Sequence, residues 1–154
     1  MFKSLIVGSK APKFRYNLAD GSSDSLENYI GRKVLICFYP KDNTPGCTHQ
    51  ANDFSQQLKK FKKLNTVVLG VSRDSIASHA KFIEKFNLKH NLLSDADEAM
   101  CQSYGVIKNK NMYGRQVRGI ERTTFLIDGK GVIQKIWRGV KVQGHVDEVL
   151  SELK

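Results

Sequence analysis

The chain has 154 residues, with 25 lysines and arginines against 15 aspartates and glutamates, and a formal net charge of +10. This length is typical of one compact domain, and we expect residues 1–154 to form a single one. No apolar run approaches the roughly 18–20 residues of a membrane span, and the N-terminal apolar stretch is too short for a secretory signal, so we expect a cytoplasmic protein. The charge would suit nucleic acid, anionic lipid or acidic proteins, but no groove-reading or base-stacking motif favours nucleic acid.

The predicted elements alternate between strands and helices. Apolar or alternating runs predict strands at residues 14–18, 22–25, 34–39, 66–72, 92–94, 123–127 and 132–137. Turn signals at Asp20-Gly21 and at residues 128–131 indicate two hairpins. Apolar residues at helical spacing predict one turn at residues 25–29 and helices from Thr48 to Phe61, after Ser75, after Asp95 and at residues 145–153. This order predicts the α/β class with a mixed sheet.

Two of these helices have an assignable apolar face, and one long segment has none. The helix capped by Ser75 is expected to bury Ile76, Ala80, Ile83 and Phe86. The last helix is expected to bury Val146, Val149, Leu150 and Leu153. Residues 108–119 are polar and contain glycine, which predicts a long mobile loop.

The three cysteines, Cys37, Cys47 and Cys101, are too few and too scattered for a secreted disulfide framework. No cysteine pair has metal-ligand spacing, and only His49 lies near one of them, so we expect no metal site. A thioredoxin-like disulfide reductase would need a Cys-x-x-Cys motif, which the chain lacks.

Cys47 has the most informative surroundings. Pro40 ends a buried strand, a turn-rich loop follows, and a helix is predicted to begin beside Cys47. Free N–H groups and the helix dipole stabilise an anion there, and the thiolate is the reactive form of cysteine. Thr44 lies three residues upstream and could turn its hydroxyl back toward the sulfur or a bound oxygen. A cysteine flanked by threonine, proline and glycine is not expected deep in a core, which favours reactivity over an inert role.

The stretch FYPKDNTPGCT, with its pattern Pro-x-x-x-Thr-x-x-Cys, resembles the active-site signature of peroxiredoxins, in particular the bacterioferritin comigratory protein or PrxQ subfamily. A second matching block is IERTTFLI at residues 120–127, and the similarity runs from Val7 to the last helix. The resemblance implies a thioredoxin-like fold with a mixed central sheet flanked by helices. It also implies a thiol peroxidase that needs no metal, haem or flavin.

The resemblance further implies a role for four residues. Cys47 would attack hydrogen peroxide or an organic hydroperoxide and become a sulfenic acid. Thr44 and Arg122 would hold the peroxide oxygens, and Pro40 would fix the loop and shield the sulfur. By itself Arg122 would be interpreted as a surface ion-pair residue near Glu121, and only the block match favours a site beside Cys47. His49 is not required by the signature.

The chain departs from many members of the subfamily at the second, resolving cysteine. The two usual positions are occupied by Asn52 and Ile83, and an engineered substitution at Asn52 would look the same. Cys37 is expected to pack in its strand. Cys101 is also expected to pack, although it is the one plausible intramolecular resolver. The simplest interpretation is a one-cysteine enzyme, a monomer or weak dimer, reduced by an external thiol such as thioredoxin, glutaredoxin or glutathione.

Overall fold

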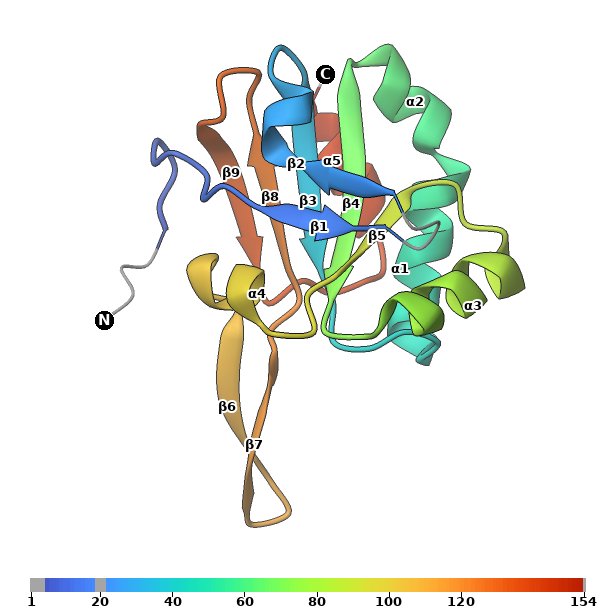
Figure 1. Ribbon diagram of the computed structural model, residues 1–154, viewed down its shortest axis with the longest axis vertical. Coiled ribbons are helices and arrows are strands. Elements are labelled where there is room, and N and C mark those ends of the chain that lie inside the picture. The colour runs from blue at the N-terminus through green and yellow to red at the C-terminus, as the bar shows by residue number, and fades with distance from the viewer. Residues whose placement is uncertain (1–4, 19–21, 154) are drawn as a thin grey trace.

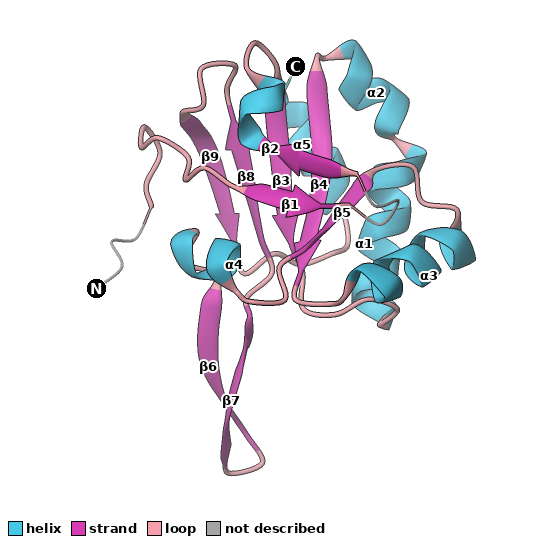
Figure 2. Cartoon of the chain, in the orientation of Figure 1, coloured by secondary structure: helices cyan, strands magenta, loops and turns pink. Residues whose placement is uncertain are grey.

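A five-stranded mixed sheet forms the centre of the protein, which we describe from a computed structural model for residues 5–18 and 22–153. The strand order is β5-β4-β3-β8-β9 (Figures 1 and 2). The strands are β3 (Lys33–Phe38), β4 (Thr66–Ser72), β5 (Asn91–Ser94), β8 (Thr123–Ile127) and β9 (Ile133–Arg138). Strands β3, β4 and β5 run parallel, and β8 and β9 run antiparallel to their neighbours. The expected thioredoxin-like arrangement is thereby confirmed.

Nearly all residues of β3 and β8 are buried, which shows that both faces of the sheet are covered. The helices are η1 (Leu26–Tyr29), α1 (Pro45–Gln56), α2 (Leu58–Lys63), α3 (Ile76–Phe86), α4 (Ala99–Ser103) and α5 (His145–Leu153). Helices α1, α2 and α5 contribute Phe54, Phe61 and Val149 to one core cluster. The N-terminal segment, η1 and α4 contribute to a second, and Figure 1 shows β1 and β2 in front of the sheet with α5 behind it.

The register of the sheet determines which loops meet. Phe38, the last residue of β3, lies opposite Val71 of β4 on one side and Thr123 of β8 on the other. The segment that leaves β3 and the segment that enters β8 therefore lie side by side at one end of the sheet, although about 80 residues separate them in the sequence.

The N-terminal hairpin is shorter than predicted. Strands β1 (Arg15–Asn17) and β2 (Ser23–Ser25) pair antiparallel, and the helical turn expected next is η1. The predicted turn at Asp20-Gly21 lies outside the described residues. Strand β4 and helix α5 have the expected bounds, and the buried face of α5 includes the four apolar residues predicted for it.

The helix predicted from Thr48 to Phe61 begins earlier and is divided in two. It begins at Pro45, which suits the first helical position because its fixed φ is helical and it needs no N–H partner there. The helix ends at Gln56, and α2 starts two residues later. The change of direction lets the ring of Phe61 pack 5.7 Å from that of Phe54.

The buried face of α3 was predicted only in part: Ile83 and Phe86 are partly buried against the core, but Ile76 is exposed. Ser75 caps the helix as expected, accepting a hydrogen bond from the Ser78 N–H. The buried residues, however, are His79 and Phe82, whereas Ala80 is exposed. His79 is buried although it is polar, because it finds hydrogen-bond partners inside the protein, and the apolar pattern alone did not include it.

Residues 108–119 form most of a two-stranded ribbon, β6 (Ile107–Met112) and β7 (Arg115–Ile120), and the predicted loop is wrong. The ribbon extends away from the sheet in Figure 1. Its tip is a two-residue turn in which Tyr113 has φ 52° and Gly114 has φ 77°. Two positive φ values match the twist of the paired strands and define a tight hairpin.

Within the described residues, no helix is both long enough and apolar enough to cross a membrane.

Candidate active site

Cys47 lies in the first turn of α1, two residues after Pro45 and three after the N-cap, Thr44. Its side chain is 3% exposed and belongs to a cluster with Tyr39, Ala51 and Phe82. The expectation that Cys47 lies outside the core is therefore wrong. The local sequence is turn-forming, but the cluster that buries Cys47 includes Phe82 of α3, which no local pattern could indicate.

Arg122 reaches this sulfur from the short connection between β7 and β8. Its Nη2 lies 3.1 Å from Cys47 Sγ and its Nη1 donates to Gln50 Oε1 at 2.5 Å. The guanidinium passes close to Gly46, where a Cβ would lie 3.4 Å from Arg122 Nη2, in van der Waals contact. The predicted proximity of Arg122 to Cys47 is thus confirmed, and the guanidinium stands beside the sulfur in the first turn of α1.

Gln50 is a site residue that the sequence interpretation missed. It is 3% exposed, and its Nε2 is buried with no hydrogen-bond partner among the described residues. Its position three residues after Cys47 places it on the same helical face, which was the available signal. By accepting from Nη1, Gln50 holds the guanidinium so that Nη2 faces the sulfur.

The other two predicted residues, Thr44 and Pro40, lie close to Cys47 in the chain. The Thr44 hydroxyl donates to the carbonyl oxygen of Lys41 at 2.9 Å rather than turning to the sulfur. Its backbone carbonyl accepts from the Thr48 N–H at 2.8 Å and so starts α1. Pro40 is exposed where the chain leaves β3.

The sequence matches the AhpC/TSA family over residues 7–136. The chain belongs to this family. The putative peroxiredoxin bcp of Coxiella burnetii is 49% identical over 150 residues, covering 97% of this chain and 99% of that protein. Two structures of Xanthomonas campestris Peroxiredoxin Q, each with a different cysteine replaced by serine, are 47% and 48% identical, with a TM-score of 0.88 and coverage of 91% of this chain and 89% of theirs. A cysteine variant of Xylella fastidiosa PrxQ superposes with a TM-score of 0.93 at 39% identity, covering 98% and 96%. The resemblance to the Bcp or PrxQ peroxiredoxins is confirmed, and the enzyme is a thiol-dependent peroxidase.

The remaining cysteines of this peroxiredoxin are buried and protonated. Burial raises the pKa of Cys37 to about 12, despite a hydrogen bond with Thr124. Burial, followed by the effect of Asp95, raises the pKa of Cys101 well above that of a free thiol. Cys101 also packs in the core cluster on the opposite face of the sheet from the cluster that holds Cys37. Neither thiol has the thiolate character that nucleophilic attack requires.

His49 and the region behind Arg122 complete the surroundings. The exposed ring of His49 lies 3.1 Å from Asp53 and points along α1. His145 is buried, and its Nε2 lies 2.9 Å from the Thr124 hydroxyl. Burial, with a smaller contribution from Arg122, lowers the pKa of His145 to about 4, so this ring is neutral near pH 7. Among the described residues, no group of three or more histidine, cysteine, aspartate or glutamate side chains is arranged to hold a metal ion.

Proposed function

We propose that this peroxiredoxin reduces hydrogen peroxide and organic hydroperoxides and that Cys47 is the residue that attacks them. The observation that carries the proposal is the Arg122 guanidinium 3.1 Å from the Cys47 sulfur in the first turn of a helix. A structure of the Xanthomonas campestris bacterioferritin comigratory protein, 47% identical to this chain, is described in terms of its alkyl peroxide reduction activity. This supports organic hydroperoxides as substrates here.

In the proposed reaction the Cys47 thiolate donates an electron pair to the terminal peroxide oxygen and the O–O bond breaks. The sulfur becomes a sulfenic acid, and the leaving oxygen takes up a proton as water or an alcohol. Arg122 donates to the peroxide and stabilises the charge that develops on the leaving oxygen. The Thr44 proton is directed to Lys41, so the lone pairs of its hydroxyl remain to accept from the peroxide O–H. Pro40 lies two residues after the end of β3 and would fix the start of the loop that carries Thr44.

The sulfenic acid is proposed to be resolved without a second cysteine of this chain. The cysteines replaced in the two Xanthomonas campestris variants are 36 positions apart, and the same spacing from Cys47 leads to Ile83. The other usual position is Asn52. Cys101 is fully buried in the core cluster that contains Tyr104 and Met100, so it would have to leave that cluster to reach Cys47.

An external thiol, from thioredoxin, glutaredoxin or glutathione, would attack the sulfenic sulfur, release water and form a mixed disulfide. A second thiol would then displace Cys47 and carry away the disulfide. Three free cysteines suit a reducing compartment, which supports the cytoplasm as the place of action. We propose that the enzyme works as a monomer or weak dimer.

The test of the nucleophile is peroxide consumption with dithiothreitol as reductant. Cys47→Ser is expected to abolish turnover, whereas Cys37→Ser, a matched change at a buried thiol, is expected to keep it. Turnover that persists in Cys47→Ser would refute the assignment.

The test of the one-cysteine mechanism is mass spectrometry after one equivalent of peroxide. We expect a dimedone adduct on Cys47 and no intramolecular disulfide. A Cys47–Cys101 disulfide, together with loss of thioredoxin-supported turnover in Cys101→Ser, would overturn this mechanism while leaving the peroxidase intact.

A further inference from the structure

Asp42, in the loop between β3 and α1, is the centre of a buried hydrogen-bond cluster that the reaction above does not use. Its side chain accepts from the Tyr39 hydroxyl at 2.6 Å, from the Ser78 hydroxyl at 2.8 Å and from His79 Nδ1 at 2.7 Å. Burial acts to raise the pKa of Asp42, but the hydrogen bonds from His79 and Tyr39 and the charge of His79 outweigh it, so the pKa is lowered. Asp42 is thus a carboxylate although only 6% of it is exposed.

His79, from α3, is the partner that completes the cluster. It has no exposed surface, and its Nε2 lies 3.0 Å from the carbonyl oxygen of Leu93 while its Nδ1 faces Asp42. Nδ1 thus faces an oxygen that only accepts hydrogen bonds, and the contact is almost entirely shielded from water. Removing one partner would leave the other buried without its hydrogen bond, which is costly.

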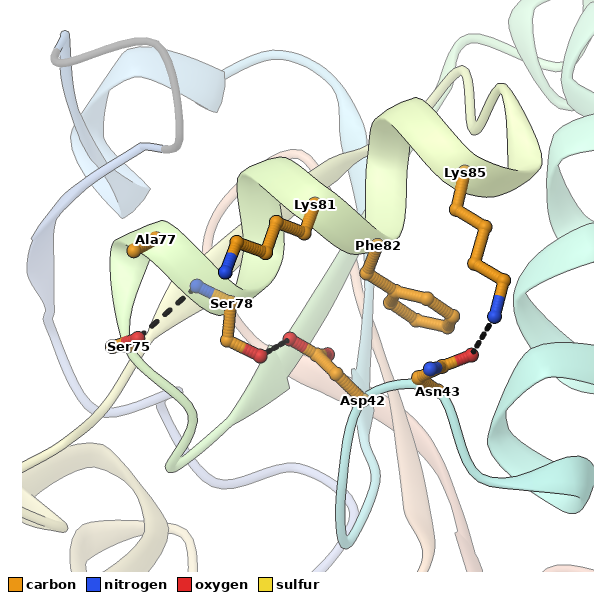
Figure 3. A pocket seen from close by; sticks show the side chains of 8 residues that line it. All are labelled: Asp42, Asn43, Ser75, Ala77, Ser78, Lys81, Phe82 and Lys85. Atoms are coloured by element: carbon orange, nitrogen blue, oxygen red, sulfur yellow. Dashed lines mark hydrogen bonds between the residues drawn. The ribbon is translucent and has the colours of Figure 1, made fainter.

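The cluster ties the loop to α3 at several points. The Asp42 backbone N–H donates to Asp74 Oδ2 at 2.8 Å, which fixes the same residue through its main chain. Figure 3 shows Asp42 directed at Ser78 across a surface pocket, and beside it Lys85 donates to Asn43 at 3.3 Å. Thr44 and the first turn of α1 follow immediately, so the position of Asp42 determines where Cys47 can lie.

We propose that Asp42 and His79 are positioning residues, a clamp that holds the first turn of α1 so that Cys47 stays beside Arg122. This inference rests on the proposed function, because it divides that reaction into two steps with opposite requirements. Cys47 is 3% exposed, which suits a peroxide of a few atoms. The thiol of a protein reductant, in contrast, must reach the sulfur itself, and a first turn held in place restricts its access.

Weakening the clamp is therefore expected to change the two steps in different directions. Peroxide attack slows, because a displacement of about 1 Å at the reacting group can cost about 100-fold in rate. Reduction of the sulfenic acid by thioredoxin stays equal or becomes faster, because the sulfur is more accessible. General damage to the fold would slow both steps together.

The decisive variants differ in which hydrogen bond of His79 they keep. His79→Gln can reach Leu93 but removes the donor that faces Asp42, whereas His79→Asn keeps an amide N–H near the place of Nδ1. The control is His90→Gln, the same change at another buried histidine, which contacts Ser55 at the far end of α1. Each protein is mixed with peroxide in stopped flow, and its preformed sulfenic acid is then mixed with thioredoxin and with dithiothreitol.

We expect His79→Gln to react with peroxide about 10–100-fold more slowly than the control, with no loss in the thioredoxin step, and His79→Asn to recover most of the peroxide rate. If His79→Gln does not fold, Ser78→Ala removes a single hydrogen bond to Asp42 and should cost about threefold in the peroxide step alone. A peroxide rate within about twofold of the control, or an equal loss in both steps, would overturn the clamp. An inactive wild-type enzyme would instead refute the proposed function.

Discussion

At the level of single residues, the site depends on how one guanidinium divides its hydrogen bonds. The fork of Arg122 is planar, so the contact of Nη1 with Gln50 fixes the direction in which Nη2 points. Nη2 faces Cys47 Sγ, and a peroxide bound at that sulfur would lie within reach of the same charge. A lysine carries equal charge but lacks the planar fork that directs one nitrogen to each contact.

The first prediction concerns this division of contacts. Arg122→Ala is expected to slow peroxide reduction by about 10²–10³, the usual cost of one well-placed donor, and Arg122→Lys to recover only part of it. Stopped-flow measurement of the second-order rate constant checks this. The control is Arg118→Ala, which removes an arginine of β7 that pairs with Glu98. Arg122→Ala with the rate of that control would exclude the residue from the reaction.

The second prediction concerns Gln50. Gln50→Leu keeps a similar volume but removes the acceptor of Arg122, so we expect peroxide reduction to slow by about tenfold, as for loss of a hydrogen bond to a charged group. Gln56→Leu, on the exposed end of α1, is the matched control. Equal rates in the two variants would mean that Arg122 orients itself without Gln50.

Some residues of the site could be predicted from a sequence motif, whereas others are identified only by their contacts in the folded protein. Cys47 and Arg122 were recognisable because each stands in a distinctive block of sequence. Gln50 and His79 are ordinary helical residues, and only packing between elements reveals their partners. The direction of the Thr44 hydroxyl depends on the carbonyl of Lys41, and this preference is local to a loop whose shape the pattern did not specify.

At the level of elements, the strongly apolar segments were predictable and the polar ribbon was not. Strand β4 is buried throughout nearly its whole length, so a continuous apolar run identifies it. The strands β6 and β7 are mostly exposed and polar, so no alternation marks a buried face. Their turn is Tyr113-Gly114 rather than the Asn-Gly that signals a tight hairpin.

The third prediction tests this turn. Tyrosine in the left-handed region costs roughly 1–2 kcal/mol, and asparagine tolerates that region better, so Tyr113→Asn is expected to stabilise the ribbon. Hydrogen exchange of the β6 and β7 amides should slow, whereas exchange in β3 and β4 should not change, because the tip of the ribbon lies away from the sheet (Figure 1). Tyr113→Phe keeps the strain and serves as the control. Equal exchange in the two variants would show that the turn stores no strain.

At the level of the whole molecule, the buried histidines link stability to pH. Burial lowers the pKa of His90 to about 4, and burial with the charge of Arg122 does the same for His145. Both rings have a pKa of 6.5 when unperturbed. Between pH 6.5 and 4 the unfolded chain therefore binds protons that the folded chain does not.

The fourth prediction follows from the sign of this difference. A histidine whose pKa is lowered by folding contributes stability above pH 6.5, and this contribution is lost as pH falls toward 4, by up to about 1.4 kcal/mol per pH unit for each ring. We expect the free energy of unfolding of His90→Gln to fall less steeply than that of the wild type over this range. Urea denaturation at pH 7.5, 6, 5 and 4.5 measures both curves.

Carboxylates such as Glu98, whose hydrogen bonds with Arg118 and Arg73 lower its pKa to about 2, are common to both proteins and cancel in the difference. Parallel curves would mean that His90 binds its proton equally well in the folded protein, and so that its burial imposes no penalty on the charged ring.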